Sequence, residues 1–168
     1  MMEAMETVHE AGACSKVPAI LREGLGWPLA RIAHAVTLAH NGALSPHGLS
    51  LRTFAVLATI EAGAARSQLE IAQTVGLDKT TLVATIDDLE RRGLVQRTPD
   101  PDDRRARILA ITADGRELFE RAAATLRATD AGIFAQMAPE DRERLKAALA
   151  ALLGGPLNEY LGRPGSCV

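Results

Sequence analysis

The spacing of hydrophobic residues changes along residues 67–116 from a helical period to a strand-like one. Two short segments, residues 68–75 and 79–91, repeat apolar residues every three or four positions, as one face of a helix does. After Gly93, two β-suited runs at residues 94–98 and 107–111 flank the turn-forming residues 99–103. This order predicts two helices followed by a β-hairpin.

Capping residues are found at the expected ends of both short helices. Residues 67–70 read Ser-Gln-Leu-Glu, the form of a capping box, and Asp78 can accept a backbone N–H at the next helix start. Gly76 and Gly93 suit the left-handed position that ends a helix. Two short capped helices with a hairpin behind them are typical of a winged helix-turn-helix.

The second helix and the hairpin carry side chains suited to DNA. Residues in the first two turns of a recognition helix meet base edges in the major groove, and arginines at a wing tip grip phosphate or enter the minor groove. The predicted DNA-binding residues are Ser67, Gln68, Lys79, Thr80, Thr81, Val83, Ala84, Arg104, Arg105 and Arg107. The alternative is that the arginines form only a solvated hairpin face.

The charge balance argues against DNA binding. The chain has a formal net charge of −2, and residues 66–112 hold eight Lys or Arg against eight Asp or Glu. We expect sign segregation to overcome this balance, with the acidic residues pointing elsewhere and the basic ones lining one surface. The acidic set is Asp78, Asp87, Asp88 and Glu90, and the basic set is Arg91, Arg92, Arg97 and the wing arginines.

Longer amphipathic segments flank the predicted lobe. One helix begins near Pro28 and stops before Asn41-Gly42, residues 45–48 form a loop, and Ser50 caps the next helix. Thr112 caps a long helix that Pro139 interrupts, and a final helix runs to Leu153. A helix of about 25 residues spans about 38 Å, more than so small a lobe covers. We therefore expect a second subunit to cover the apolar stripe of this helix. The alternative is that the helix packs onto its own hairpin partner in the same chain.

The fold class is therefore mainly α with a small β-hairpin wing. We expect one domain over residues 1–168, with a winged helix-turn-helix lobe at 50–112, dimerisation helices at 15–45 and 113–153, and a tail at 154–168. The predicted homodimer interface comprises Leu126, Ile133, Leu145, Leu149 and Leu152.

Composition gives little support to enzyme chemistry. The four histidines do not lie at metal-ligand spacing, the two cysteines form no C-x-x-C pair, and no phosphate-binding glycine loop is present. We therefore expect no catalytic residues, no metal and no cofactor. No apolar run approaches the ~20 residues of a membrane span and residues 1–12 lack a signal-peptide pattern, so a cytoplasmic location is expected. Cys14 and Cys167 are not expected to form a disulfide there.

Two runs in the lobe carry a family resemblance. The segment DDLERRGLV at residues 87–95, and DPDDRRARILAIT at 100–112 followed by ADG, resemble the wing region of MarR-family regulators. The resemblance extends from about Trp27 to Leu153. It implies a homodimer with interlocking terminal helices, a double-stranded pseudo-palindromic operator, and a small effector held between the lobe and the dimer helices.

The resemblance also implies an effector site. An aromatic face and a cation for an aromatic acid are expected from Trp27, Arg31, His34, Arg52 and Phe54. The urate-responsive branch would need an aspartate and an arginine where Ala55 and Ala84 stand, which argues against urate. We therefore expect a ligand-responsive repressor. The alternatives are a winged-helix protein-interaction module without DNA binding and a redox-sensing regulator that uses Cys14.

Overall fold

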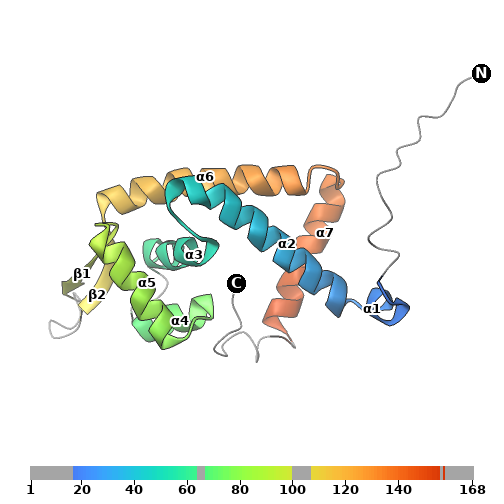
Figure 1. Cartoon of the computed structure of the whole chain (residues 1–168), viewed down its shortest axis with the longest axis horizontal. Coiled ribbons are helices and arrows are strands. Elements are labelled where there is room, and N and C mark those ends of the chain that lie inside the picture. Colours follow the sequence, from blue (N-terminus) through green and yellow to red (C-terminus); the bar gives the residue numbers. More distant parts are fainter. Residues whose placement is uncertain (1–16, 64–66, 100–106, 156, 158–168) are drawn as a thin grey trace, which may run out of the picture. The chain divides into compact units, whose positions relative to one another are not determined.

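The computed structural model describes residues 17–63, 67–99, 107–155 and 157 (Figure 1). The chain divides into two units, residues 1–38 and 39–168. In the first unit lie α1 (Ala19–Glu23) and the start of α2 (Gly26–Leu44), and neither element buries a residue before Leu44.

Helix α2 ends later than its sequence predicts. It continues through Asn41-Gly42 to Leu44, and residues 45–47 form a short 3-10 helix, η1 (Ser45–His47). Leu44 is fully buried, and the Asn41 side-chain oxygen accepts a hydrogen bond from the Leu51 backbone N–H at 2.8 Å. Tertiary contacts therefore hold a helical turn that a local Asn-Gly pair would otherwise end. Gly48 follows with a φ of 66°, which suits a residue without a Cβ.

The winged lobe is built from three helices and a hairpin in the second unit. They are α3 (Leu51–Glu61), α4 (Gln68–Val75), α5 (Lys79–Arg91), β1 (Val95–Pro99) and β2 (Arg107–Ile111). The two strands are antiparallel, with Val95 opposite Ile111 and Pro99 opposite Arg107. The fold is therefore mainly helical with a two-stranded wing, as predicted.

One apolar core joins the elements of the lobe. Leu57 of α3, Ile71 of α4 and Ile86 of α5 are each 0% exposed, and Leu94 and Val95 close the core from the hairpin side. Burial of a side chain of this size contributes about 1.5–3 kcal/mol relative to exposure. The lobe therefore has a complete hydrophobic core within one chain.

The four capping residues predicted in this unit each cap their helix. Ser50 accepts a hydrogen bond from the Thr53 N–H, and Thr112 accepts one from the Gly115 N–H. Ser67 and Glu70 form a complete capping box, and Asp78 caps α5. These bonds satisfy N–H groups that have no partner inside the helix.

The long helix α6 (Ala113–Ile133) begins directly against the hairpin. Gly115 lies so close to the chain that a Cβ there would be 2.0 Å from the Leu94 carbonyl oxygen and 2.9 Å from Ile111 Cγ1. Thr112 also donates its hydroxyl to the Gly93 carbonyl at 2.7 Å. The start of α6 is therefore fixed to the lobe by close backbone packing.

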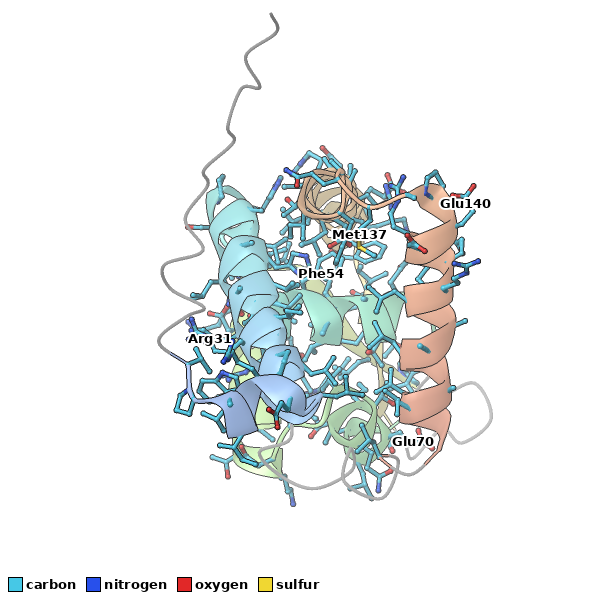
Figure 2. All side chains as sticks on the ribbon, turned by 90° about the vertical axis from the view of Figure 1, so that its right-hand side faces the viewer. Arg31, Phe54, Glu70, Met137 and Glu140 are labelled. Atoms are coloured by element: carbon cyan, nitrogen blue, oxygen red, sulfur yellow. The ribbon has the colours of Figure 1, made fainter. Side chains whose placement is uncertain are left out.

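Beyond the lobe, α6 and α7 (Pro139–Gly154) differ in burial. Ala122 and Leu126 of α6 pack with Leu44 and Leu49 in a second small core. Helix α7, whose first turn is marked by Glu140 in Figure 2, buries none of its residues. Among the described helices, none is long and apolar enough to cross a membrane.

Candidate functional site

Helix α5 has one buried face and one exposed face. Leu82, Ile86 and Leu89 are 0–1% exposed and anchor it in the lobe core. On its outer side Lys79, Thr80 and Ala84 are exposed, as a helix that reads DNA requires. Thr81 and Val83, the other two predicted contacts on this helix, are only partly exposed.

The first turn of α5 is held by a network around Asp78. The Asp78 carboxylate accepts the Thr81 hydroxyl at 2.6 Å and the Thr81 backbone N–H at 2.9 Å. These two hydrogen bonds hold the pKa of Asp78 below its usual range, so the cap stays ionised at neutral pH. Because Thr81 donates its hydroxyl proton to Asp78, its side chain can offer DNA only an acceptor.

Helix α4 precedes α5 across Gly76, whose φ of 65° makes the turn between the two helices. Ser67 Oγ accepts from the Glu70 N–H at 3.2 Å, and Glu70 accepts from the Ser67 N–H at 2.8 Å. The Ser67 hydroxyl oxygen therefore already accepts a bond within its own helix. Ser67 is exposed and Gln68 partly so, at the end of the helix where backbone N–H groups favour phosphate.

The acidic residues of α5 do not separate from the basic ones as the sequence suggested. Asp88 pairs with Arg91 at 3.0 Å and with Arg92 at 3.3 Å. Asp87 and Glu90 pair with Arg97 at 3.2 and 3.3 Å.

These ion pairs reduce the positive charge that the lobe exposes to solvent. The predicted separation of the acidic side chains from Arg91, Arg92 and Arg97 is wrong, because each of these arginines lies within 3.3 Å of a carboxylate oxygen on α5. Exposed pairs of this kind contribute only about 0–1 kcal/mol each to stability. The first turn of α5 is left with Lys79 as its exposed cation.

The wing residues lie largely outside the described part of the chain. Arg104 and Arg105 fall in the undescribed stretch 100–106, and only the backbone of Arg107 is described, as the first residue of β2. Their predicted contact with DNA stays a prediction. Cys14 and Cys167 also lie outside the described residues.

An apolar pocket of about 450 Å³ opens between α3 and α4. Its volume is within the range of ligand sites in proteins. Two of the five predicted effector residues, Arg52 and Phe54, line it. Its complete lining is Leu51, Arg52, Phe54, Ala55, Ala58, Thr59, Thr74, Val75 and Leu77.

Phe54 is fixed in place by a second aromatic ring. The rings of Phe54 and Phe119 stack with centroids 5.4 Å apart and planes 17° apart. Phe119 lies on α6, 65 positions away in sequence, and no local pattern pointed to this pair. The stack attaches one wall of the pocket to the long helix.

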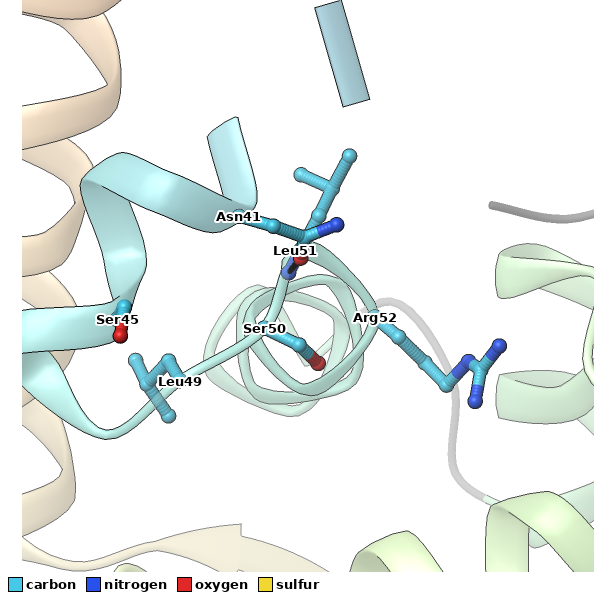
Figure 3. A pocket seen from close by; sticks show the side chains of 6 residues that line it. All are labelled: Asn41, Ser45, Leu49, Ser50, Leu51 and Arg52. Carbon is cyan, nitrogen blue, oxygen red and sulfur yellow. Dashed lines mark hydrogen bonds between the residues drawn. The ribbon is translucent and has the colours of Figure 1, made fainter. Parts of the chain in front are cut away.

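Arg52 lines three hollows. It lines the α3–α4 pocket, a polar hollow of about 440 Å³ with Asn41 and Ser45, and a third hollow of about 460 Å³ against α5. Figure 3 shows its side chain extending away from Asn41 and Ser45. The third hollow is lined by Arg52, Thr53, Thr80, Thr81, Ala84, Thr85 and Asp88.

The other predicted effector residues belong to the first unit. Trp27, Arg31 and His34 lie on α2 and are exposed there, Trp27 to 43%. Arg31 is labelled in Figure 2. They lie outside the unit that holds the α3–α4 pocket, so their role in an effector site stays a prediction.

The predicted interface residues fall into two groups. Leu126 is only 9% exposed and packs against Leu44, Leu49 and Ala122 of its own chain, so it offers little surface to a second subunit. The other four remain at least partly exposed: Ile133 (40%), Leu145, Leu149 (39%) and Leu152 (36%).

Part of this apolar surface lines a small groove. Leu145 and Leu149 of α7, with Phe134 after α6, line a hollow of about 260 Å³ whose charged residues are Asp130, Arg142 and Lys146.

Two histidines contact α6, and no pattern in the sequence indicated either contact. His40 Nε2 lies 2.8 Å from Asp130 Oδ1, and His47 Nε2 lies 2.9 Å from Thr125 Oγ1. The partners are separated by 90 and 78 positions. Both histidines hold residues 39–47 against α6, and no group of three potential metal ligands occurs among the described residues.

Comparison with known proteins identifies the family to which this fold belongs. A sequence model described as "MarR family" matches residues 47–106. The crystal structure of CouR from Rhodococcus jostii RHA1 bound to p-coumaroyl-CoA is 33% identical, covers 83% of this chain and 98% of its own, and superposes with a TM-score of 0.72.

Two further structures are similar. The repressor CouR bound to a 23-mer DNA duplex is 32% identical over 80% of this chain and 95% of its own, with a TM-score of 0.71. A MarR family protein of Mycobacterium tuberculosis in complex with p-aminosalicylic acid is 28% identical over 77% of this chain and 98% of its own, with a TM-score of 0.65.

Proposed function

This chain belongs to the MarR family of winged helix-turn-helix transcriptional regulators, and we propose that it is a repressor whose homodimer binds a pseudo-palindromic operator and leaves it when an aromatic effector binds. Family membership confirms the prediction of a regulator rather than an enzyme. The observation that carries the proposal is the exposed outer face of α5, held by a buried stripe and an ionised cap.

Base readout is assigned to the start of α5. Lys79 can donate to guanine O6 or N7, the Thr80 hydroxyl can pair with either base type, and Ala84 can contact a thymine methyl. Ser67 and Gln68 at the start of α4 would contact phosphate, which orients the lobe without reading sequence. A relative bound to a 23-mer DNA duplex supports the proposal that this chain binds DNA.

The homodimer is proposed from the exposed leucines of α7. Leu149, Leu152 and Leu153 are 36–50% exposed, although they belong to the last of the described helices of a folded chain. A second copy that covers them would also bring two α5 helices onto one face of DNA, about one helical turn apart.

The effector is proposed to be an aromatic acid or its coenzyme A thioester, held in the α3–α4 pocket. The pocket offers apolar side chains to a ring and Arg52 to an anionic group. Relatives bound to p-coumaroyl-CoA and to p-aminosalicylic acid support this ligand class. The effector must bind more tightly to a form of the protein that fits DNA poorly, since equal affinity for both forms shifts nothing.

The proposed base contacts are tested with Lys79→Ala and Thr80→Ala, using the intergenic DNA upstream of the gene that encodes this protein. Each should weaken operator binding by about 1–3 kcal/mol if it makes a base contact, and should change binding to scrambled DNA much less. Arg121→Ala, which removes an exposed cation on α6 that pairs with Glu117, serves as the control. Equal loss on both DNAs would show backbone contact only. A wild-type protein that binds neither DNA would favour the protein-interaction alternative.

A further inference from the structure

The hydroxyl group of Thr81 is oriented by the cap of α5. Asp78 Oδ2 lies 2.6 Å from Thr81 Oγ1, and Asp78 Oδ1 accepts the Thr81 backbone N–H at 2.9 Å. These hydrogen bonds keep the pKa of Asp78 below its usual range, so its carboxylate is ionised and has no proton to donate. The single proton of the Thr81 hydroxyl must therefore lie between Oγ1 and Asp78.

This arrangement leaves the Thr81 oxygen as an acceptor on the outer side of the lobe. A hydroxyl has one donor and two lone pairs, and Asp78 takes the donor. Thr81 is partly exposed and lines a hollow of about 460 Å³ together with Thr80 and Ala84, which are both exposed. Because Thr80 and Ala84 are assigned to base contacts, Thr81 borders the surface proposed to face the major groove.

We propose that Thr81 accepts a hydrogen bond from an exocyclic amino group in the major groove, and that Asp78 fixes the direction of this bond. Adenine N6 and cytosine N4 carry such donors, whereas guanine O6 and thymine O4 are acceptors. An oxygen that can only accept pairs with the first two bases and repels the oxo group of the other two. The assignment rests on the proposed function and adds a position at which hydrogen-bond direction distinguishes bases.

Asp78→Asn separates a role in base recognition from a purely structural cap. Asn caps a helix about as well as Asp does. Its side-chain oxygen can accept the Thr81 backbone N–H, which turns the amide NH2 group toward Thr81 Oγ1. The Thr81 hydroxyl proton is then released, so the hydroxyl can donate to an oxo group as well as accept from an amino group.

The test is a map of base preference for the full-length protein. Each base pair in one half-site of the bound intergenic DNA is changed in turn to the other three. Fluorescence anisotropy measures the dissociation constant for every duplex with wild type, Asp78→Asn and Thr81→Val. The valine variant keeps a branched side chain and removes the hydroxyl.

Two control variants make matched changes elsewhere. Thr129→Val removes a hydroxyl on α6 that donates to the Thr125 carbonyl at 2.9 Å. Asp88→Asn removes from α5 a carboxylate that pairs with Arg91 and Arg92. The first should reproduce the wild-type map, and the second should change the affinity for all duplexes by the same factor.

At one position of the half-site, wild type should prefer adenine or cytosine to guanine and thymine by about tenfold or more. Thr81→Val should lose most of this preference, and Asp78→Asn should bind guanine or thymine there almost as well as the preferred base. Preferences at the other positions should not change. Whether the preferred base is adenine or cytosine identifies the amino group.

Three outcomes would overturn the assignment while wild type still binds its operator, and they leave the repressor proposal intact. Thr81→Val with the wild-type map would exclude the contact, and Asp78→Asn with the wild-type map would exclude the fixed bond direction. A uniform loss of affinity at every position in both variants would show that the cap is structural only. If Thr81→Val melts early, Asp78→Asn carries the test because it keeps the cap. Absence of operator binding by wild type would overturn the repressor proposal itself.

Discussion

The winged lobe and helix α7 differ in how much of their apolar surface their own chain covers. In the lobe, Leu57, Ile71 and Ile86 are completely buried against one another's elements. In α7, none of the described residues is buried, and three of its leucines are 36–50% exposed. The lobe therefore folds around its own core, whereas α7 presents a surface that a second copy is proposed to cover.

This contrast assigns separate tasks to the two regions. A lobe with a closed core can hold the outer face of α5 in one orientation, which base readout requires. Exposed leucines that gather on one helix are typical of an interaction surface. Helix α6 connects the two regions, and its start packs on the hairpin at Gly115.

The largest expected effect comes from opening the lobe core. Ile86→Ala removes a fully buried side chain and should lower the free energy of unfolding by about 2–5 kcal/mol. Leu69→Ala on α4, where the side chain is 67% exposed, is the matched control and should change it by less than about 0.5 kcal/mol. Urea denaturation followed by circular dichroism measures both. Similar losses in the two variants would contradict a core confined to the buried face.

The next effect concerns α7. Leu149→Asp would place a carboxylate in the proposed interface and should weaken the homodimer by roughly a hundredfold, about 2.8 kcal/mol. The fold of the lobe should persist, because α7 contributes no residue to its core. Sedimentation velocity over a concentration series measures the dissociation constant. A variant that remains a folded dimer at the same concentrations would remove Leu149 from the interface.

A smaller effect is expected at the junction. Gly115→Ala would add a Cβ 2.0 Å from the Leu94 carbonyl oxygen, so the start of α6 must move away from the hairpin. Overpacking of this kind costs about 1–3 kcal/mol. Gly132→Ala, where an added Cβ meets nothing within 4 Å, is the control on the same helix. Thermal unfolding of the two variants measures the difference, and equal melting temperatures would show that the junction yields without cost.

The sequence predicted the lobe well because its signals are local. Capping residues Ser50, Ser67, Asp78 and Thr112 act within three positions, so these four helix starts could be predicted without knowledge of the fold. The end of α2 was mispredicted at Asn41-Gly42, because burial of Leu44 depends on residues far along the chain.

The site was less predictable, since its geometry depends on distant partners. The i,i+3 and i,i+4 spacing of Asp88 with Arg91 and Arg92 is a local signal for ion pairing that the expected separation of charges did not take into account. The pairing of Asp87 and Glu90 with Arg97 instead depends on how the hairpin packs beside α5. The stack of Phe54 on Phe119 and the contact between His40 and Asp130 join residues 65 and 90 positions apart. No helical or strand period encodes such contacts, whereas the buried stripe of α5 follows directly from one.

Specific binding of the winged lobe to an operator is tested most directly by the salt dependence of DNA affinity. Operator affinity is measured against salt for wild type and for Arg104→Ala/Arg105→Ala, on specific and scrambled duplexes. Wild type should bind the operator at least about a thousandfold more tightly than scrambled DNA. Its affinity should fall linearly with salt on logarithmic axes, and the slope should decrease by up to about two in the double variant. Salt-independent binding by wild type, or equal affinity for both duplexes, would contradict specific operator binding by the lobe.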